Sequence, residues 1–364
     1  MVSIETIRRT NARATREMEA LLRREGIAPD PHLEESIGAY DDDGALIATG
    51  SLFGRTLRCL AVDGAHRGEG LMALIVGELL TRLAARGVTH AFVYTKPQAA
   101  GQLRQLGFYE IARVEGRLAF LENRRGAFDG YLSALAREKK PGRCAAVVMN
   151  ANPFTLGHRY LLETAAREND WLHCFVVSED ASLVPFDVRM ALVQEGAADL
   201  PNVLVHPSGD YIISAATFPS YFLKGDEDTA AVHAALDAAV FARIAHALDV
   251  TVRYVGEEPY SRTTAIYNDA LCAGLPREGV EVRVVPRRQG PQGKPVSASE
   301  VRQRLKDEGP DAICGLVPES TRRYFASPAA EPVLARSRAA AHVRNECRGG
   351  LLQRVSQIGR PAIL

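Results

Sequence analysis

The chain has 364 residues, 46% hydrophobic and 24% charged, which is typical of a globular protein and exceeds the size of one comfortable core. Its 44 Lys and Arg residues balance its 44 Asp and Glu residues, so no general attraction to nucleic acid or to an anionic membrane is expected. The six cysteines lie far apart without a C-x-x-C pair, which favours reduced, mostly buried thiols in a cytoplasmic protein and no metal site. The charged N-terminus is unlike a signal peptide, and no apolar run is expected to reach membrane-spanning length.

The N-terminal region is predicted to form an α+β domain, because short β-branched runs alternate with amphipathic segments. An Asp-Gly pair at residues 43–44 marks a tight turn between two strands, and Gly87 ends the most regular amphipathic pattern. In chain order we expect a helix over 3–25, strands over 36–40, 45–52 and 56–62, a helix over 71–85, a strand over 89–95, and helices over 99–106 and 128–138.

A glycine-rich basic turn at 63–70 contains Arg67, Gly68 and Gly70 and stands between a predicted strand and a predicted helix. Backbone N–H groups at such a helix start favour anions. This stretch resembles the GNAT acetyltransferase family, whose Arg-x-x-Gly-x-Gly/Ala turn binds the pyrophosphate of acetyl-CoA. The resemblance implies a GNAT-like domain with an acyl-CoA-like site at Arg67, Gly68 and Gly70. Met72 departs from the family, which has Gly or Ala there, and a GNAT-like fold without acetyltransferase chemistry remains the alternative.

A charged Pro-Gly segment near residue 140 is predicted to be a linker. We therefore expect domains over 1–139 and 140–326, and a basic tail over 327–364 with a solvated helix at 333–345. In the second domain, continuous apolar runs alternate with helices, which is typical of a Rossmann-like parallel sheet covered on both faces. The predicted strands cover 144–149, 172–178, 203–206, 250–255 and 280–285, and the predicted helices cover 157–167, 185–198, 230–248, 263–272 and 300–306.

The segment after the 144–149 strand is the strongest candidate for a nucleotide site, because ligands bind parallel sheets beyond the C-terminal ends of the strands. Thr155 and His158 stand at a helix start, where preorganised donors stabilise the charge that develops on an attacked phosphate. They are the candidate catalytic groups, and Gly157 lets the backbone approach the phosphates. We expect further nucleotide contacts from Asn150, Asn152, Pro153 and Phe154, with Phe154 near the adenine–ribose side.

A second polar element follows the last predicted strand. Ser297 and Ser299 open a short helix there and would bind the β- and γ-phosphates, while Arg302 would stabilise the leaving pyrophosphate. If the run stood alone, an ordinary serine N-cap would be the commoner explanation. Gly256 and Glu257 end another predicted strand, where substrate or ribose contacts are expected. The aromatic run at 211–224 is predicted either to pack as lid or core or to line a pocket for a small acyl group or an incoming arm.

The Thr-x-Gly-His element at 155–158 and the Ser-x-Ser-x-x-Arg element at 297–302 resemble the nucleotidyltransferase superfamily, which attacks the α-phosphate of ATP. Together with the GNAT-like domain, three segments resemble the citrate lyase ligase family: residues 149–161, 256–259 and 296–302. The resemblance implies an AMP-forming ligase that uses acetate and ATP to acetylate the prosthetic-group thiol on citrate lyase's acyl-carrier subunit through an acetyl-adenylate. It also implies Mg²⁺ held mainly by the phosphates, and no covalent intermediate on the enzyme.

Two other functions fit parts of the sequence. The same fold would serve an adenylyltransferase that moves AMP to a phosphate-bearing cofactor precursor, although the weakly charged 211–224 run does not supply an obvious pocket for that phosphate. Alternatively, the protein would be a GNAT acetyltransferase or acetyl-CoA sensor with a nucleotide-binding regulatory domain. Met72 and the two intact phosphate elements favour the ligase over this third function.

Overall fold

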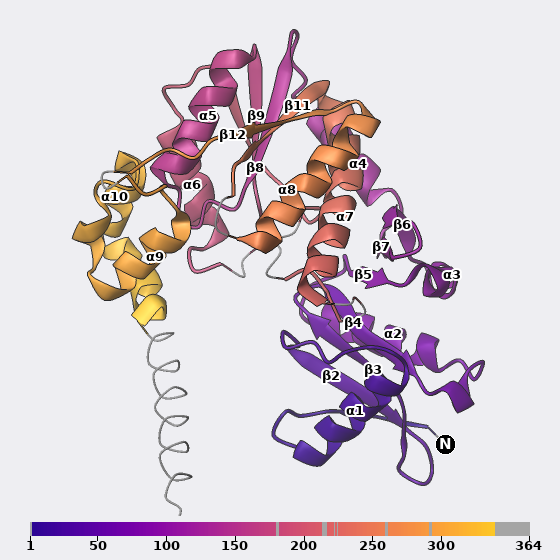
Figure 1. Ribbon diagram of the computed structural model, residues 1–364. Coiled ribbons are helices and arrows are strands. Elements are labelled where there is room, and N and C mark those ends of the chain that lie inside the picture. Colours follow the sequence, from indigo (N-terminus) through magenta and orange to yellow (C-terminus); the bar gives the residue numbers. More distant parts are fainter. Residues whose placement is uncertain are drawn as a thin grey trace, which may run out of the picture. The chain divides into compact units, whose positions relative to one another are not determined.

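The structure is a computed structural model that describes residues 2–179, 182–212, 217–221, 223, 225–258, 261–290 and 293–338 (Figure 1). The chain folds into two compact units. The first comprises residues 1–139, 215–249 and 258–281, and the second comprises residues 140–214, 250–257 and 282–364. The domain boundaries drawn from the sequence stay predictions. The one near residue 140 coincides with the first change of unit along the chain.

A mixed sheet of seven strands organises the first unit, in the order β1-β2-β3-β4-β5-β7-β6. β4 and β5 pair in parallel, and the other neighbouring strands pair antiparallel. This is the α+β architecture expected for the GNAT-like region. Its strands are β1 (Ser3–Thr6), β2 (Glu35–Tyr40), β3 (Leu46–Phe53), β4 (Thr56–Val62), β5 (Phe92–Thr95), β6 (Tyr109–Val114) and β7 (Leu118–Glu122). Its helices are α1 (Ala12–Arg24), α2 (Leu71–Ala85), α3 (Pro97–Gln105), α4 (Ala127–Ala136), α7 (Gly225–Leu248) and α8 (Arg262–Gly274).

The single helix predicted over residues 3–25 is wrong at its start. Residues Ser3–Thr6 form β1, which pairs antiparallel with β2 at the edge of the sheet. The helix begins at Ala12, because the side chain of Asn11 caps it by accepting a hydrogen bond of 3.1 Å from the backbone N–H of Ala14. The pairing of β1 with β2 is a non-local interaction that overrides the helical spacing of the first residues.

α2 anchors the first hydrophobic core beside the glycine-rich turn. Its buried residues Leu71, Ile75, Val76, Leu79 and Leu83 recur at helical spacing and pack into the same cluster as side chains from β2, β3, β4 and β5. Burying each such aliphatic side chain stabilises the fold by about 1.5–3 kcal/mol relative to exposure. The start of α2 is therefore held in a fixed position relative to β4.

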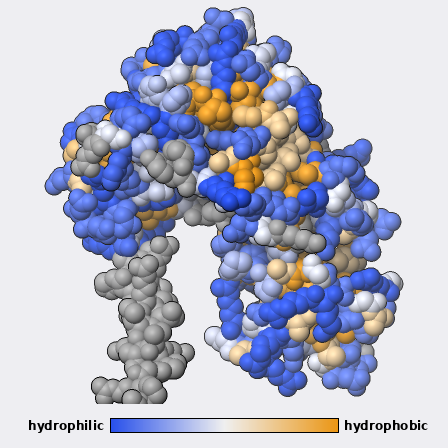
Figure 2. Space-filling view, in the orientation of Figure 1, coloured by the Kyte–Doolittle hydropathy of each residue, from blue (hydrophilic) through white to orange (hydrophobic). Residues whose placement is uncertain are grey.

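The expectation that no apolar run reaches membrane-spanning length is wrong for α7. Gly225–Leu248 is 24 residues long and apolar enough to cross a bilayer, with a mean hydropathy of 1.3 over its most apolar window, although no such segment was expected. That window is 67% buried inside the protein, as in the core helix of a globular unit. The face drawn in Figure 2 is predominantly hydrophilic, and hydrophobic side chains gather on it only in patches.

The second unit is built on a five-stranded sheet in the order β10-β9-β8-β11-β12. β8 lies at its centre, and the pairs β10–β9, β9–β8 and β8–β11 are parallel, which confirms the Rossmann-like prediction. The strands are β8 (Cys144–Met149), β9 (Trp171–Val176), β10 (Val203–Pro207), β11 (Val250–Gly256) and β12 (Glu281–Val285). The helices are α5 (Leu156–Glu168), α6 (Phe186–Gly196), α9 (Ala298–Asp307) and α10 (Glu319–Phe325).

The beginning of the C-terminal tail belongs to the core of the second unit. Residues 331–338 are helical, starting two residues before the predicted helix, and Val333 and Leu334 are buried in one cluster with Val301 and Phe325. The prediction of a solvated tail helix is therefore wrong for these residues, because an apolar pair on the helix packs against α9 and α10. The rest of the predicted helix, 339–345, lies outside the described residues.

Candidate active site

The turn between β8 and α5 lies at the C-terminal end of the central strand of the second unit. The chain reverses direction through Ala151, which has a positive φ of 49°, and through a cis peptide bond between Asn152 and Pro153. Ala151 and Pro153 are buried. Thr155 then takes an extended conformation and caps α5. The turn thus brings the first N–H groups of α5 to the edge of the sheet where ligands bind parallel α/β folds.

Thr155 and His158 form a reciprocal capping box at the start of α5. The Thr155 hydroxyl accepts a hydrogen bond of 3.3 Å from the backbone N–H of His158. In return, the backbone N–H of Thr155 donates to Nδ1 of His158 at 3.1 Å, and the hydroxyl lies 3.0 Å from the same nitrogen. Because Nδ1 accepts from a backbone N–H, the proton of the neutral imidazole must be on Nε2. His158 therefore offers an Nε2–H donor.

The environment of His158 keeps its imidazole neutral. Burial and then the positive charges of Arg287 and Arg302 lower the pKa of His158 from 6.5 to about 4. At neutral pH the ring carries one proton, and the capping box selects the nitrogen that holds it. The site thus combines a neutral directional donor with two nearby guanidinium groups. That combination suits a polyphosphate.

The second predicted element lies beside this turn. Arg302 on α9 donates from Nη1 to the backbone oxygen of Asn152 at 2.6 Å and from Nη2 to Oγ of Ser299 at 3.0 Å. Burial lowers the pKa of Arg302 below its usual value, although the group stays protonated at neutral pH. Ser297 caps α9 by accepting from the backbone N–H of Glu300 at 3.1 Å. Two elements separated by about 140 residues in sequence thus meet at one place.

Gly157 accounts for the close approach of the two elements. A Cβ atom at this position would lie 3.1 Å from the backbone oxygen of Val296, which directly precedes Ser297. That distance is tighter than almost all real Cβ contacts, so an alanine would push the start of α5 away from the serine element. The expected role of Gly157 in letting backbone approach a phosphate stays a prediction. Its approach to the neighbouring backbone is observed.

The asparagines of the turn make structural hydrogen bonds. Asn150 donates from Nδ2 to Oγ of Ser182 at 3.1 Å, and Oδ1 of Asn152 accepts from the backbone N–H of Val184 at 3.0 Å. Phe154 is fully buried, and its backbone oxygen accepts from Oγ1 of Thr321 at 2.9 Å. The ring of Phe154 packs in the core beneath the turn and supports it, and its expected place near the adenine–ribose side stays a prediction.

Arg189 on α6 is a site residue that the sequence reasoning missed. Its side chain is fully buried, and it donates to the backbone oxygens of Asn150 and Val177 at 2.8 and 2.7 Å and to that of Val184 at 2.9 Å. It also donates to Oδ1 of Asn150 at 2.9 Å. One guanidinium thereby ties together the turns that follow β8 and β9. A helical arginine has no local sequence signal for this role, because the backbone oxygens to which it donates at the two turns lie five or more residues away along the chain.

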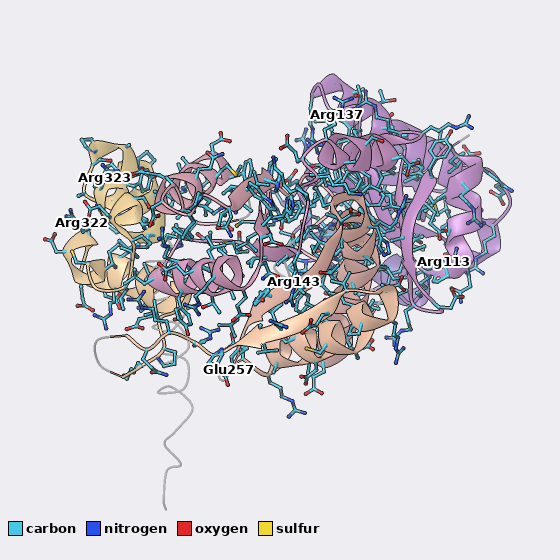
Figure 3. The ribbon with its side chains drawn as sticks, turned by 90° about the horizontal axis from the view of Figure 1, so that it is seen from above. Arg113, Arg137, Arg143, Glu257, Arg322 and Arg323 are labelled. Atoms are coloured by element: carbon cyan, nitrogen blue, oxygen red, sulfur yellow. The ribbon has the colours of Figure 1, made fainter. Side chains whose placement is uncertain are left out.

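Gly256 is the last residue of β11 and Glu257 follows it directly, so both stand at the end of a strand as predicted. Glu257 is exposed (Figure 3), its backbone N–H donates to the oxygen of Val285, and its own backbone oxygen accepts from Nε of Arg287 at 2.7 Å. Arg287 lies in the segment after β12 and was not predicted. Its effect on the pKa of His158 places its charge near the imidazole.

The first predicted phosphate turn lies in the other unit. Gly68 and Gly70 have positive φ angles of 89° and 77°, which glycine adopts without strain, and Gly70 is the N-cap of α2. Arg67 points its guanidinium at Glu25, with Nη2 2.5 Å from Oε2 of that carboxylate. Arg67, Gly68 and Gly70 all line a cavity of about 590 Å³. Whether this cavity binds an acyl-CoA-like ligand stays a prediction.

The described residues contain no group of three or more His, Cys, Asp or Glu side chains arranged to hold a metal ion. Among the cysteines in the same ranges, three are buried and two are exposed, all with free thiols, and Cys347 lies outside them. The donors around the α5 turn are cationic or neutral. They fit the phosphates of a nucleotide, and a Mg²⁺ ion there would depend on those phosphates for its ligands.

Comparison with known proteins identifies the family. Residues 144–325 match the model of the citrate lyase ligase C-terminal domain. A [citrate [pro-3S]-lyase] ligase from Escherichia coli is 38% identical over 329 residues, which cover 88% of this chain and 92% of the relative. This chain belongs to the citrate lyase ligase family. A ligase of the same name from Klebsiella pneumoniae is 40% identical over 77% of this chain and 83% of its own. As a citrate lyase ligase, the protein is an enzyme of the ligase class that activates citrate lyase.

Similar solved structures align over about a third of the chain. A putative acyl-CoA N-acyltransferase from Klebsiella pneumoniae is 17% identical, with a TM-score of 0.28, and covers 34% of this chain and 96% of its own. A GNAT family N-acetyltransferase from Escherichia coli in complex with CoA is 21% identical, with a TM-score of 0.27, and covers 35% of this chain and 85% of its own.

Proposed function

We propose that the protein uses ATP and acetate to acetylate the prosthetic-group thiol on the acyl-carrier subunit of citrate lyase. A carboxylate oxygen of acetate attacks the α-phosphorus of ATP, and the bond to the pyrophosphate oxygen breaks. The carrier thiol then attacks the carbonyl carbon of the acetyl-adenylate and loses its proton, and AMP leaves with the bonding electrons. Both steps need only positioning and charge stabilisation, so no nucleophile from the enzyme is required.

The convergence of His158 and Arg302 at the end of β8 carries this proposal. His158 offers a fixed Nε2–H donor, and Arg302 lies against the same turn through its 2.6 Å hydrogen bond to Asn152. The starts of α5 and α9 add uncharged N–H donors next to them. We assign His158 and Thr155 to the attacked α-phosphate, and Arg302 with Ser297 and Ser299 to the leaving pyrophosphate.

The remaining assignments concern the groups around the phosphates. Gly256 and Glu257 end a neighbouring strand and are proposed to contact ribose or substrate, while Asn150 and Asn152 shape the nucleotide turn. Mg²⁺ would neutralise the phosphates when bound with ATP. A cytoplasmic location is part of the proposal, and the balanced charge of the chain supports the absence of nucleic-acid and membrane partners.

Incubation with ATP, labelled acetate and the purified carrier subunit tests the proposal. We expect acetate-dependent AMP formation, with the label on the carrier as a hydroxylamine-sensitive thioester. AMP transfer to another acceptor without acetate would favour a nucleotidyltransferase. Labelling of the carrier from acetyl-CoA alone, without ATP, would favour an acetyltransferase. A preparation that lacks the carrier should still exchange labelled pyrophosphate into ATP when acetate is present.

A further inference from the structure

The segment between β12 and α9 (Figure 1) contains a tight hairpin, formed in the described structure by residues 288–290 and 293–296. The N–H of Gly290 donates to the backbone oxygen of Lys294 at 2.7 Å, and the N–H of Val296 donates to that of Arg288 at 3.0 Å. A Cβ atom at Gly290 would lie 3.0 Å from the oxygen of Lys294, so a larger residue would push the two arms apart. Arg288 and Lys294 therefore stand on facing arms of one closed turn.

The base of this hairpin is fixed to the candidate active site. Val296 is buried in one cluster with Val301 and Leu316. Its backbone oxygen approaches the start of α5, where it lies 3.1 Å from the position of a Cβ atom on Gly157. The next residue, Ser297, caps α9. Because its base is buried, the hairpin holds its side chains in place, and a partner that docks on it does not have to order a mobile loop.

The hairpin lies in a stretch that carries only positive charge. Between Glu281 and Glu300 the chain has four basic residues and no acidic residue. Arg288 and Lys294 are exposed and, within the described ranges, their side chains have no hydrogen bond or ion pair. Glu300 pairs with Arg304 at 2.7 Å, and the two arginines of α10 also pair with acids. The hairpin thus presents two cations that the chain itself does not neutralise.

The basic residues of this region differ in depth. Arg302 is half-buried and bound to the 150–158 turn, as expected of a group that holds a nucleotide phosphate between the starts of α5 and α9. Arg288 and Lys294 are exposed and make no side-chain contact with that turn in the described structure. Exposed charges around a site act mainly on the association with a large partner of opposite charge. The outer pair therefore fits a protein that approaches from solvent.

We propose that the hairpin is the docking surface of the carrier subunit, and that Arg288 and Lys294 pair with carboxylates on an acidic face of that protein. This inference rests on the proposed function, which makes the carrier the second substrate. The carrier has to settle close to the acetyl-adenylate, because its thiol is on an arm of limited reach. Docking beside Ser297 would deliver that thiol at a raised effective concentration. The first half-reaction takes place without the carrier and does not depend on the hairpin.

Calorimetric titration of the full-length protein with the purified, deacetylated carrier subunit tests this inference. We expect the double variant Arg288→Gln with Lys294→Gln to bind the carrier about five- to tenfold more weakly than the wild type, as for the loss of two exposed ion pairs. The KM for the carrier in thioester formation should rise by the same factor. Added salt should weaken the wild-type complex more than that of the double variant.

The matched control is Arg322→Gln with Arg323→Gln, which removes two exposed cations that already pair with acids on α10. Its affinity for the carrier should equal that of the wild type. The single variants Arg288→Gln and Lys294→Gln should each weaken binding about two- to threefold, so the test does not depend on the folding of the double variant.

Acetate-dependent pyrophosphate exchange without the carrier should proceed at the wild-type rate in all of these variants. Loss of the exchange in a double variant that is folded by circular dichroism would place the two cations on ATP and would overturn the inference. Wild-type affinity for the carrier in the double variant would overturn it as well. Carrier binding that depends on Arg288 and Lys294 but yields no thioester would count against the proposed function alone. Thioester formation with an unchanged KM for the carrier would count against the docking surface alone.

Discussion

Two turns of this protein share one local pattern, a strand followed by a glycine-containing turn and a helix, yet they differ in what surrounds them. The turn at 63–70 is mostly exposed, its arginine pairs with Glu25, and surface ion pairs hold it. The turn at 150–158 is half-buried, is held by the fully buried Arg189, and has cationic neighbours. An anion-binding motif therefore indicates only the local backbone geometry of the turn. The charges of the residues around the turn decide which anions it binds.

Replacement of Arg189 should have the largest effect on stability. Arg189→Gln leaves several backbone oxygens at the ends of β8 and β9 without their donor, and losing a buried charged partner typically costs about 3–5 kcal/mol. Arg67→Gln removes an exposed ion pair and should cost at most about 1 kcal/mol. Urea unfolding of both variants measures the difference. Equal losses of unfolding free energy would show that the two turns are supported alike.

Among variants that keep the fold, replacement of His158 should have the largest effect on the reaction rate. His158→Ala removes a preorganised donor and should lower the rate of acetate-dependent pyrophosphate exchange by about 10²–10³-fold or more. His66→Ala removes the histidine of the other turn and should leave the exchange unchanged. Circular dichroism checks that both variants are folded. A wild-type exchange rate in His158→Ala would remove His158 from the site.

Arg302 should contribute less than His158 does. Arg302→Gln removes a charge from the proposed pyrophosphate pocket and should raise the barrier by about 2–3 kcal/mol, which would appear mainly in kcat of pyrophosphate release. Arg304→Gln is the matched control on the same helix, because Arg304 pairs with Glu300 at 2.7 Å and not with the turn. Similar kcat values in the two variants would contradict the proposed role of Arg302.

The pH dependence of stability should show the smallest effect. The folded pKa of His158, about 4, lies below its ordinary 6.5, so the unfolded chain binds more protons between these values. Stability from this residue is therefore present above about pH 6.5 and is lost as the pH falls toward 4. His173 has a similarly lowered pKa, so the test compares unfolding of wild type and His158→Gln at pH 7 and pH 5. Between pH 7 and pH 5, His158→Gln should lose less unfolding free energy than the wild type. An equal loss in the two proteins would contradict the lowered pKa of His158.

Local patterns predicted the elements on which both turns are built. β4, α2 and β8 begin and end at the predicted residues, because their apolar periodicity and flanking glycines are strong local signals. The spacing of Thr155, His158 and Arg302 predicted them as site residues, and that assignment stays a prediction. The N-terminal helix was misjudged because β1 forms only by pairing with β2. β6 and β7 were missed for the same reason, since antiparallel pairing through a tight turn defines them.

Non-local contacts account for the rest of what the sequence did not reveal. Arg189 reaches the 150–158 turn from α6, and Arg287 acts on the pKa of His158 from the segment after β12. Phe154 turns inward because Thr321 and the core of the second unit hold it. Arg322 and Arg323, by contrast, are basic residues on α10 (Figure 3) that pair with nearby acids on the surface. Sequence alone does not separate a buried arginine from an exposed one, because both occur in polar helical positions.

Acetate labelled with ¹⁸O in its carboxylate tests the central claim most directly, namely attack on the α-phosphorus at the 150–158 turn. If acetate attacks there, one labelled oxygen stays on phosphorus after the thiol takes the acetyl group. Mass spectrometry of the products should therefore find ¹⁸O in AMP and none in pyrophosphate. Unlabelled AMP formed together with acetylated carrier would contradict an acetyl-adenylate at this site.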